Sequence, residues 1–132
     1  MAYNFLLIGN PADAWRRRLQ DAIAPLGDLH SFTEKEARVR RGGGTHYDVV
    51  VVDATEVERV EEAVTQFSSQ LNPPYIIVMA SDLSWQDAHR AFQAGASDYI
   101  RKYGEKDKLA RFFTDFLTNP ATGGGGRRPG GK

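Results

Sequence analysis

The sequence has no cysteine, which excludes disulfides, thiolate metal sites and cysteine nucleophiles. It also lacks a long hydrophobic run, because its 41% hydrophobic content is divided among short segments, none near the roughly 18 to 20 residues of a membrane helix. The first ten residues have no basic start and only a short apolar stretch, so they do not resemble a signal peptide. Neither charge sign is in excess, with 17 Lys and Arg against 17 Asp and Glu. We therefore expect a soluble, cytoplasmic protein that binds neither membrane nor nucleic acid through its overall charge.

Motifs that bind nucleotides or support hydrolysis are missing too. There is no G-x-G-x-x-G, no G-K-[ST] and no G-x-S-x-G, and the glycines at 42–44 precede a predicted strand instead of linking a strand to a helix. A small ligand-binding or enzymatic domain is thus the least supported interpretation. We expect no enzyme activity and no bound organic cofactor.

Short β-branched or aromatic runs do alternate with segments of helical periodicity. Alternation of this kind predicts a parallel sheet with crossover helices, here an α/β domain of five βα units at residues 1–118. The Val-rich run at 48–52 has the composition of a central strand buried on both faces. The predicted strands are 3–8, 29–32, 48–52, 75–79 and 98–101, and the first four predicted helices begin near residues 10, 34, 55 and 84. The last predicted helix is identified by an apolar stripe at helical spacing: Leu109, Phe112, Phe113, Phe116 and Leu117.

Three local signals predict where helices begin, and one predicts where a helix ends. Asn10-Pro11 suits an N-cap followed by the first helical residue. Thr55 with Glu58, and Ser84 with Asp87, have the spacing of capping boxes. Gly95 should end the fourth helix, which carries the apolar residues Ala88, Ala91 and Phe92.

Open α/β sheets bind ligands beyond the carboxyl ends of their strands. Asp53 follows the Val-rich run and Lys102 follows the last predicted strand. Because both positions lie at the same edge of a parallel sheet, we expect Asp53 and Lys102 to lie within ion-pair distance.

The positions of Asp53 and of the segment AGASDYIRK at 94–102 resemble the receiver (CheY-like) domain of two-component response regulators. The resemblance covers residues 3 to 117 and implies a flavodoxin-like (βα)5 three-layer sandwich with strand order 2-1-3-4-5. It also implies that Asp53 accepts a phosphoryl group from a histidine kinase, with Lys102 as charge partner and Mg²⁺ as counter-ion. By the same resemblance, Ala80, Ser81 and Tyr99 occupy the switch positions, although an aromatic residue in a terminal strand also suits simple packing.

Departures from the family's pattern affect the metal site most. Gly9 and Asn10 stand where the family has an acidic pair, which leaves Asp53 and Asn10 as a weak, degenerate metal site. With Lys102 and Asp53 alone the pocket is neutral, so it demands no cation. Three further acidic residues are near enough in sequence to supply a substitute carboxylate: Asp13, Glu56 and Asp82.

Two signalling interpretations remain. The favoured one is an atypical or pseudo-receiver in a phosphorelay pathway, an interaction module that works through a histidine kinase, an effector domain or a homodimer formed by the last two helices. The alternative is an ordinary phosphoacceptor receiver modified on Asp53. Trp15 should belong to the core, whereas Trp85 should be exposed and able to anchor a partner. Residues 119–132, rich in Gly, Arg and Pro, are expected to be a flexible tail or linker.

Overall fold

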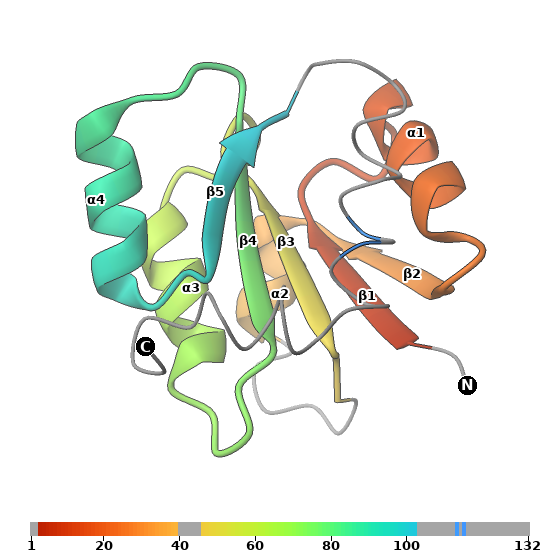
Figure 1. The fold of residues 1–132 in the computed structure, drawn as a ribbon, viewed down its shortest axis with the longest axis horizontal. Coiled ribbons are helices and arrows are strands. Elements are labelled where there is room, and N and C mark those ends of the chain that lie inside the picture. The colour runs from red at the N-terminus through yellow and green to blue at the C-terminus, as the bar shows by residue number, and fades with distance from the viewer. Residues whose placement is uncertain (1–2, 40–45, 103–112, 114, 116–132) are drawn as a thin grey trace.

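The computed structural model describes residues 3–39, 46–102, 113 and 115, and it contains five strands and four helices within these residues. Figure 1 shows α1 on one side of the central sheet and α3 and α4 on the other. In chain order the elements are β1 (Tyr3–Ile8), α1 (Ala14–Ile23), β2 (Gly27–Phe32), α2 (Glu34–Val39), β3 (Val49–Asp53), α3 (Val60–Ser68), β4 (Tyr75–Ala80), α4 (Trp85–Ala94) and β5 (Asp98–Arg101).

All five strands pair in parallel, in the order β2-β1-β3-β4-β5. The predicted fold class and strand order are therefore confirmed. Strand β3 lies in the middle, pairing Val52 with Ile8 of β1 and Asp53 with Met79 of β4. This register brings the ends of β1, β3 and β4 together at the carboxyl edge of the sheet.

The core consists of two apolar layers that share β3. Val50 and Val52 pack with α2, α3 and α4, whereas Val49 and Val51 pack with α1 and Phe113. Every residue of β3 is buried, which explains why the strand is a continuous Val run instead of an alternating one. Phe113 also meets Phe5 edge to face, with ring centroids 5.6 Å apart. The rest of the stripe predicted for the last helix lies outside the described residues.

The first helix begins later than predicted. Its N-cap is Asp13, whose carboxylate accepts a hydrogen bond from the Trp15 N–H, and not Asn10. Asn10 instead accepts from the Ala12 N–H through Oδ1, in a turn closed by the Asp13 N–H donating to the Asn10 carbonyl. Pro11 belongs to this turn, and the correction matters because it places a carboxylate at the start of α1.

The capping box predicted at Thr55 and Glu58 is also wrong. Helix α3 begins at Val60, and its N-cap Arg59 makes no side-chain capping bond. The Thr55 hydroxyl donates to Asp53 instead, so a partner in tertiary structure replaces the local one.

Helix α4 begins and ends at its predicted signals. Ser84 Oγ accepts from the Asp87 N–H, and Gly95 ends the helix with φ 118°, a left-handed value that favours glycine. Of its apolar residues, Ala91 is buried, whereas Phe92 is 45% exposed. No helix within the described residues is long and apolar enough to cross a membrane.

Candidate functional site

Asp53 lies at the end of β3 with only 1% of its surface exposed. One carboxylate oxygen, Oδ1, accepts two hydrogen bonds from Thr55, from the backbone N–H at 3.0 Å and from the hydroxyl at 2.6 Å. The other oxygen, Oδ2, lies 2.8 Å from the Lys102 ammonium. Both oxygens of this buried carboxylate are therefore engaged by the protein itself.

Lys102 follows β5 and is as deeply buried as Asp53, with a side chain 1% exposed. Besides the contact with Asp53, Nζ donates to Thr55 Oγ1 at 2.9 Å and to Asp13 Oδ2 at 3.2 Å. The backbone fixes this position, because the Lys102 N–H donates to the Ala80 carbonyl at 2.7 Å. The predicted Asp53–Lys102 ion pair is confirmed as geometry, and it belongs to a larger group that we call the lysine cage: Asp13, Asp53, Thr55 and Lys102.

Trp15 closes one side of the lysine cage. Its Nε1–H donates to the Lys102 carbonyl at 3.1 Å, and the ammonium lies 4.9 Å from the centroid of the indole ring. A cation at this distance from an indole face is attracted by the ring quadrupole. Trp15 is 4% exposed, so its predicted place in the core is confirmed, and it also shapes the site.

The charges of the cage perturb its ionisable groups in the expected directions. Burial alone would lower the pKa of Lys102, but the hydrogen bonds and negative charges of Asp53 and Asp13 outweigh it and raise that pKa. The Trp15 N–H, assisted by Lys102, lowers the pKa of Asp13 against a smaller opposing effect of burial. Lys102 is therefore a cation at neutral pH and Asp13 an anion, and the cage combines one ammonium with the carboxyl groups of two aspartates.

The residues at this edge do not fit a bound divalent cation in the arrangement observed. Gly9 offers no side-chain oxygen, and Asn10 Oδ1 is taken by the Ala12 N–H. The Asp53 oxygens are occupied by Thr55 and Lys102. Among the described residues, no three His, Cys, Asp or Glu side chains are grouped so that they could hold a metal ion.

Gly9 allows the close packing of this edge. A Cβ added to Gly9 would lie 3.0 Å from Asp53 Cβ and 3.4 Å from its Oδ2. The missing side chain thus does more than remove a metal ligand, because it gives Asp53 the room in which it now lies.

The predicted switch residues lie beside the lysine cage and not in it. Ala80, Ser81 and Tyr99 line a cavity of about 590 Å³ between α3 and α4, which Thr55 also borders. Ala80 is buried and has no hydroxyl to offer, whereas Ser81 is exposed. Tyr99 is partly buried and packs against the core, as the packing interpretation proposed. Burial, and then the charge of Asp87, raises the pKa of its phenol.

Of the three substitute carboxylates considered from the sequence, Asp13 is the one that contacts Lys102. Asp82 lines the same cavity as Tyr99, and Glu56 is exposed. Thr55 and Trp15 were not predicted as site residues. The signal for Asp13 was present in Asp13-Ala14-Trp15, where an Asp precedes an amphipathic helix as an N-cap should, but Asn10-Pro11 offered a competing start.

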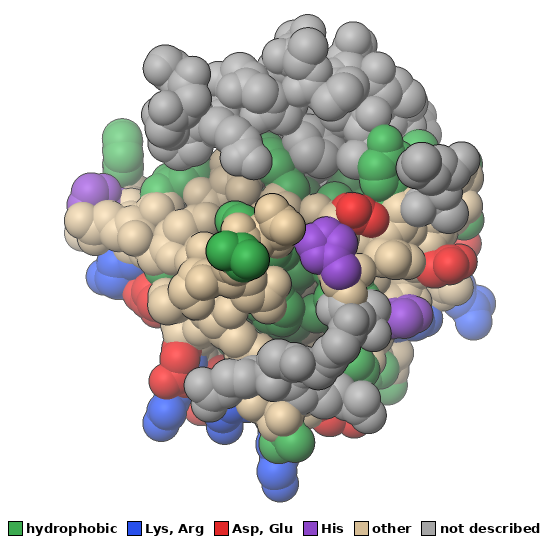
Figure 2. Space-filling model, turned by 90° about the horizontal axis from the view of Figure 1, so that it is seen from below, with side chains coloured by type: hydrophobic (Ala, Val, Ile, Leu, Met, Phe, Trp, Pro, Cys, Tyr) green, Lys and Arg blue, Asp and Glu red, His purple; other side chains and the backbone are tan. Residues whose placement is uncertain are grey.

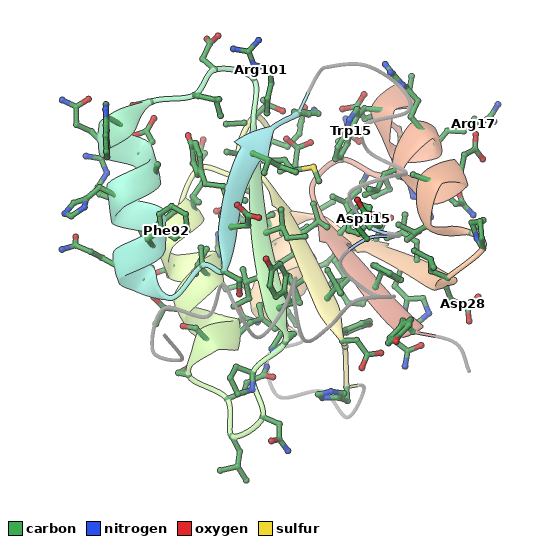
Figure 3. All side chains as sticks on the ribbon, viewed as in Figure 1. Trp15, Arg17, Asp28, Phe92, Arg101 and Asp115 are labelled. Carbon is green, nitrogen blue, oxygen red and sulfur yellow. The ribbon has the colours of Figure 1, made fainter. Side chains whose placement is uncertain are left out.

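Helix α4 presents a different kind of surface. Trp85 is 86% exposed, in agreement with its predicted exposure, and Phe92 lies two turns further along the helix. Figure 3 places Trp15 and Phe92 on opposite sides of the sheet. At the amino edge of the sheet, charged side chains of both signs are scattered around the margin (Figure 2), in line with the balanced composition.

Similarity to known proteins is found in the fold of this chain and not in its sequence. No protein-family model matches the sequence, and no curated protein matches it. The fold is similar to that of the phosphorylated cyanobacterial phytochrome response regulator RcpA, with TM-score 0.74 and 14% identity over 91% of this chain and 96% of that one. A response regulator from Thermotoga maritima gives TM-score 0.75 and 17% identity over 89% of this chain and 99% of that one. The orphan response regulator HP1043 of H. pylori gives TM-score 0.72 and 18% identity over 87% of this chain and 96% of that one.

Proposed function

We propose that this chain is a receiver-like signalling module of a two-component or phosphorelay pathway, and that it acts through protein–protein contacts without Mg²⁺-dependent phosphorylation of Asp53. The fold similarity supports the class, since the similar structures are described as response regulators. It is an argument from fold, so the mode of action has to be argued from the site.

One observation supports this mode of action: the Lys102 ammonium already forms an ion pair with the Asp53 carboxylate that would be phosphorylated. Phosphoryl transfer depends on positioning and on neutralising the charge that develops on the transferred group. Here Asp53 Oδ2 is 2.8 Å from Lys102 and Oδ1 accepts two hydrogen bonds from Thr55, in a place that is 1% exposed. A phosphoryl donor would have to open this cage and would find no second acidic residue at Gly9 or Asn10 to hold a cation.

Ordinary phosphorylation is the second candidate, and one feature favours it. Asp53 and Lys102 both occupy the positions that the resemblance assigns to phosphoacceptor and charge partner, and they are in contact. In that case a histidine kinase would modify Asp53 and the α4 side would respond. Partners on either interpretation are proteins: a kinase, an effector domain or a second copy of this chain.

Phosphodonor labelling separates the two candidates. We expect 10 mM Mg²⁺ with a small phosphodonor such as acetyl phosphate to leave Asp53 unmodified, as measured by intact-protein mass spectrometry. Beryllofluoride, which mimics a phosphoryl group, should likewise leave the amide NMR spectrum unchanged. Mg²⁺-dependent labelling that disappears in Asp53→Asn would overturn the proposal and establish the ordinary receiver.

Acidic substitutions at positions 9 and 10 test whether the missing acidic pair is the reason why Asp53 is not phosphorylated. Asn10→Asp keeps an acceptor for the Ala12 N–H and adds a charge at the edge of the sheet. Gly9→Asp is more disruptive, because its Cβ would crowd Asp53 Cβ at 3.0 Å. We therefore expect the double variant to acquire Mg²⁺ affinity and some labelling, at the expense of a displaced Asp53. Gly9→Ala, which adds the Cβ without the charge, is the matched control.

A further inference from the structure

The Lys102 ammonium lies in a nearly complete shell of oxygen atoms. An ammonium group has three N–H donors, and the structure gives three acceptors: Asp53 Oδ2 at 2.8 Å, Thr55 Oγ1 at 2.9 Å and Asp13 Oδ2 at 3.2 Å. The acceptors come from the end of β3, from the loop that follows it and from the N-cap of α1. The Trp15 ring covers a further side.

We propose that the oxygen atoms of Asp13, Asp53 and Thr55 form a cation site which this chain fills with its own lysine, and that removing the ammonium uncovers a site for a hard divalent cation, with Ca²⁺ preferred. The inference rests on the proposed function in one respect, that the pocket works without a metal. It explains why the pocket works without a metal, because the Lys102 ammonium occupies the place that a metal ion would take. It also identifies Asp13 as the second carboxylate beside Asp53.

Charge supports this assignment. Without Lys102 the cage would hold two carboxylates whose oxygens now lie within 2.8 Å and 3.2 Å of one common point, the lysine nitrogen. Two carboxylates so close repel each other and disfavour ionisation. A divalent cation at that point would neutralise both, whereas an ammonium leaves one negative charge over.

Distance decides which cation fits best. The three oxygens lie 2.8 to 3.2 Å from the lysine nitrogen, and Ca²⁺ takes oxygen ligands at about 2.3–2.6 Å against about 2.0–2.1 Å for Mg²⁺. The cage must contract less for Ca²⁺, which also tolerates irregular geometry and mixed carboxylate, hydroxyl and water ligands. Asp13 has a side chain 24% exposed, so water can complete the shell from that side.

The test compares two ways of removing the ammonium in the full chain. Lys102→Ala deletes the charge and opens space, whereas Lys102→Met deletes the same charge but keeps a side chain of similar length in the cage. In a Trp85→Phe background, Trp15 is the only tryptophan left, since the chain has two. Its fluorescence reports on the cage, and thermal unfolding with increasing Ca²⁺ gives an independent readout.

We expect Ca²⁺ to raise the melting temperature of Lys102→Ala and to change Trp15 fluorescence with saturation, with no such effect on Lys102→Met or on the parent chain. Adding Asp13→Asn to Lys102→Ala should weaken Ca²⁺ binding by about 10- to 100-fold or more. Mg²⁺ should bind more weakly than Ca²⁺. Equal responses of Lys102→Ala and Lys102→Met, or binding unaffected by Asp13→Asn, would overturn the proposal.

A measurement on the unaltered protein covers the case in which Lys102→Ala does not fold. The Lys102 NH₃⁺ group should give a slowly exchanging signal in ¹⁵N NMR, because all three donors are engaged and buried. Low concentrations of Mn²⁺ should not broaden it, since the ammonium already fills the site. Selective Mn²⁺ broadening of Lys102 would show that a metal enters beside the lysine and would contradict the inference.

These outcomes are distinguishable from those that test the proposed function. Labelling of Asp53 in the parent chain addresses phosphorylation, whereas Ca²⁺ binding by Lys102→Ala addresses the identity of the cation position. A chain that resists labelling but gains no Ca²⁺ site on Lys102→Ala would keep the proposed function and lose this inference.

Discussion

The two tryptophans of the chain lie in two regions that differ in burial and polarity. Trp15, 4% exposed, covers a buried ionic cage on the α1 side, whereas Trp85, 86% exposed, projects from the start of α4. The first region is polar, and its described buried side-chain polar atoms all have hydrogen-bond partners. The second is apolar in part and open. Internal ion pairs hold the first region together, whereas the second region leaves an aromatic side chain accessible to a partner.

Substitutions in the two regions should have different energetic effects. A buried charge that loses its partner is strongly destabilising, because its desolvation is no longer compensated. An exposed aromatic side chain contributes little to folding but can contribute much to association. Mutations on the two sides should therefore separate stability from binding.

The largest expected effect follows from removing the resident cation. Lys102→Met leaves Asp53 and Asp13 without their common partner, and we expect a loss of about 3–5 kcal/mol in the free energy of unfolding. Urea denaturation followed by circular dichroism measures it. Lys35→Met, the same substitution at an exposed lysine of α2, should change the free energy by less than about 0.5 kcal/mol. A loss at Lys102 as small as that control would mean that the cage is not closed in solution.

A smaller effect is expected at Asp13. Asparagine is as good an N-cap as aspartate, so Asp13→Asn should keep the bond from Trp15 N–H and remove chiefly the charge that faces Lys102. We expect a loss of about 1–2 kcal/mol at pH 7, against almost none for Asp21→Asn, an exposed position on α1.

The pH dependence of that loss has a defined sign. The folded-state pKa of Asp13 is lowered below the ordinary aspartate value of 3.8, so its carboxylate stabilises the fold above pH 3.8 and that contribution disappears as the pH falls through the lowered pKa. The difference between the parent chain and Asp13→Asn should therefore shrink below about pH 3.8. A difference that stays constant from pH 7 into that range would show that Asp13 acts through something other than its charge.

Sequence periodicity predicted the elements that bury the most apolar surface. Composition predicted the buried Val run of β3, and the resemblance predicted the strand order. Gly95 was predicted to end α4 because few residues besides glycine adopt the left-handed conformation found there. The convergence of Asp53 and Lys102 followed from topology alone, because Asp53 ends one strand of a parallel sheet and Lys102 directly follows another.

Competition between local and distant partners limited the rest. Thr55 has the spacing of a cap, but its hydroxyl is worth more to a buried carboxylate and a buried ammonium than to an exposed helix end. Asn10-Pro11 suits a helix start, yet the chain makes a turn there and Asp13 takes the N-cap position. Phe92 fits the apolar period of α4 but falls outside the buried stripe. Such choices depend on contacts between residues far apart in sequence, which no local pattern contains.

The smallest expected effect on stability, and the sharpest test of the open region, concerns Trp85. Because Trp85 is 86% exposed, Trp85→Ala should change the free energy of unfolding by less than about 0.5 kcal/mol. It should also abolish the acrylamide-accessible part of the tryptophan fluorescence and leave the shielded emission of Trp15.

If α4 forms the contact between two copies of this chain, sedimentation velocity should show self-association that weakens at least tenfold in Trp85→Ala, as expected for an aromatic anchor at an interface. Gln93→Ala, an exposed position on the same helix, is the matched control and should leave association unchanged. A large loss of stability in Trp85→Ala would show that this side chain is packed, and the contrast between the two tryptophans would then fail.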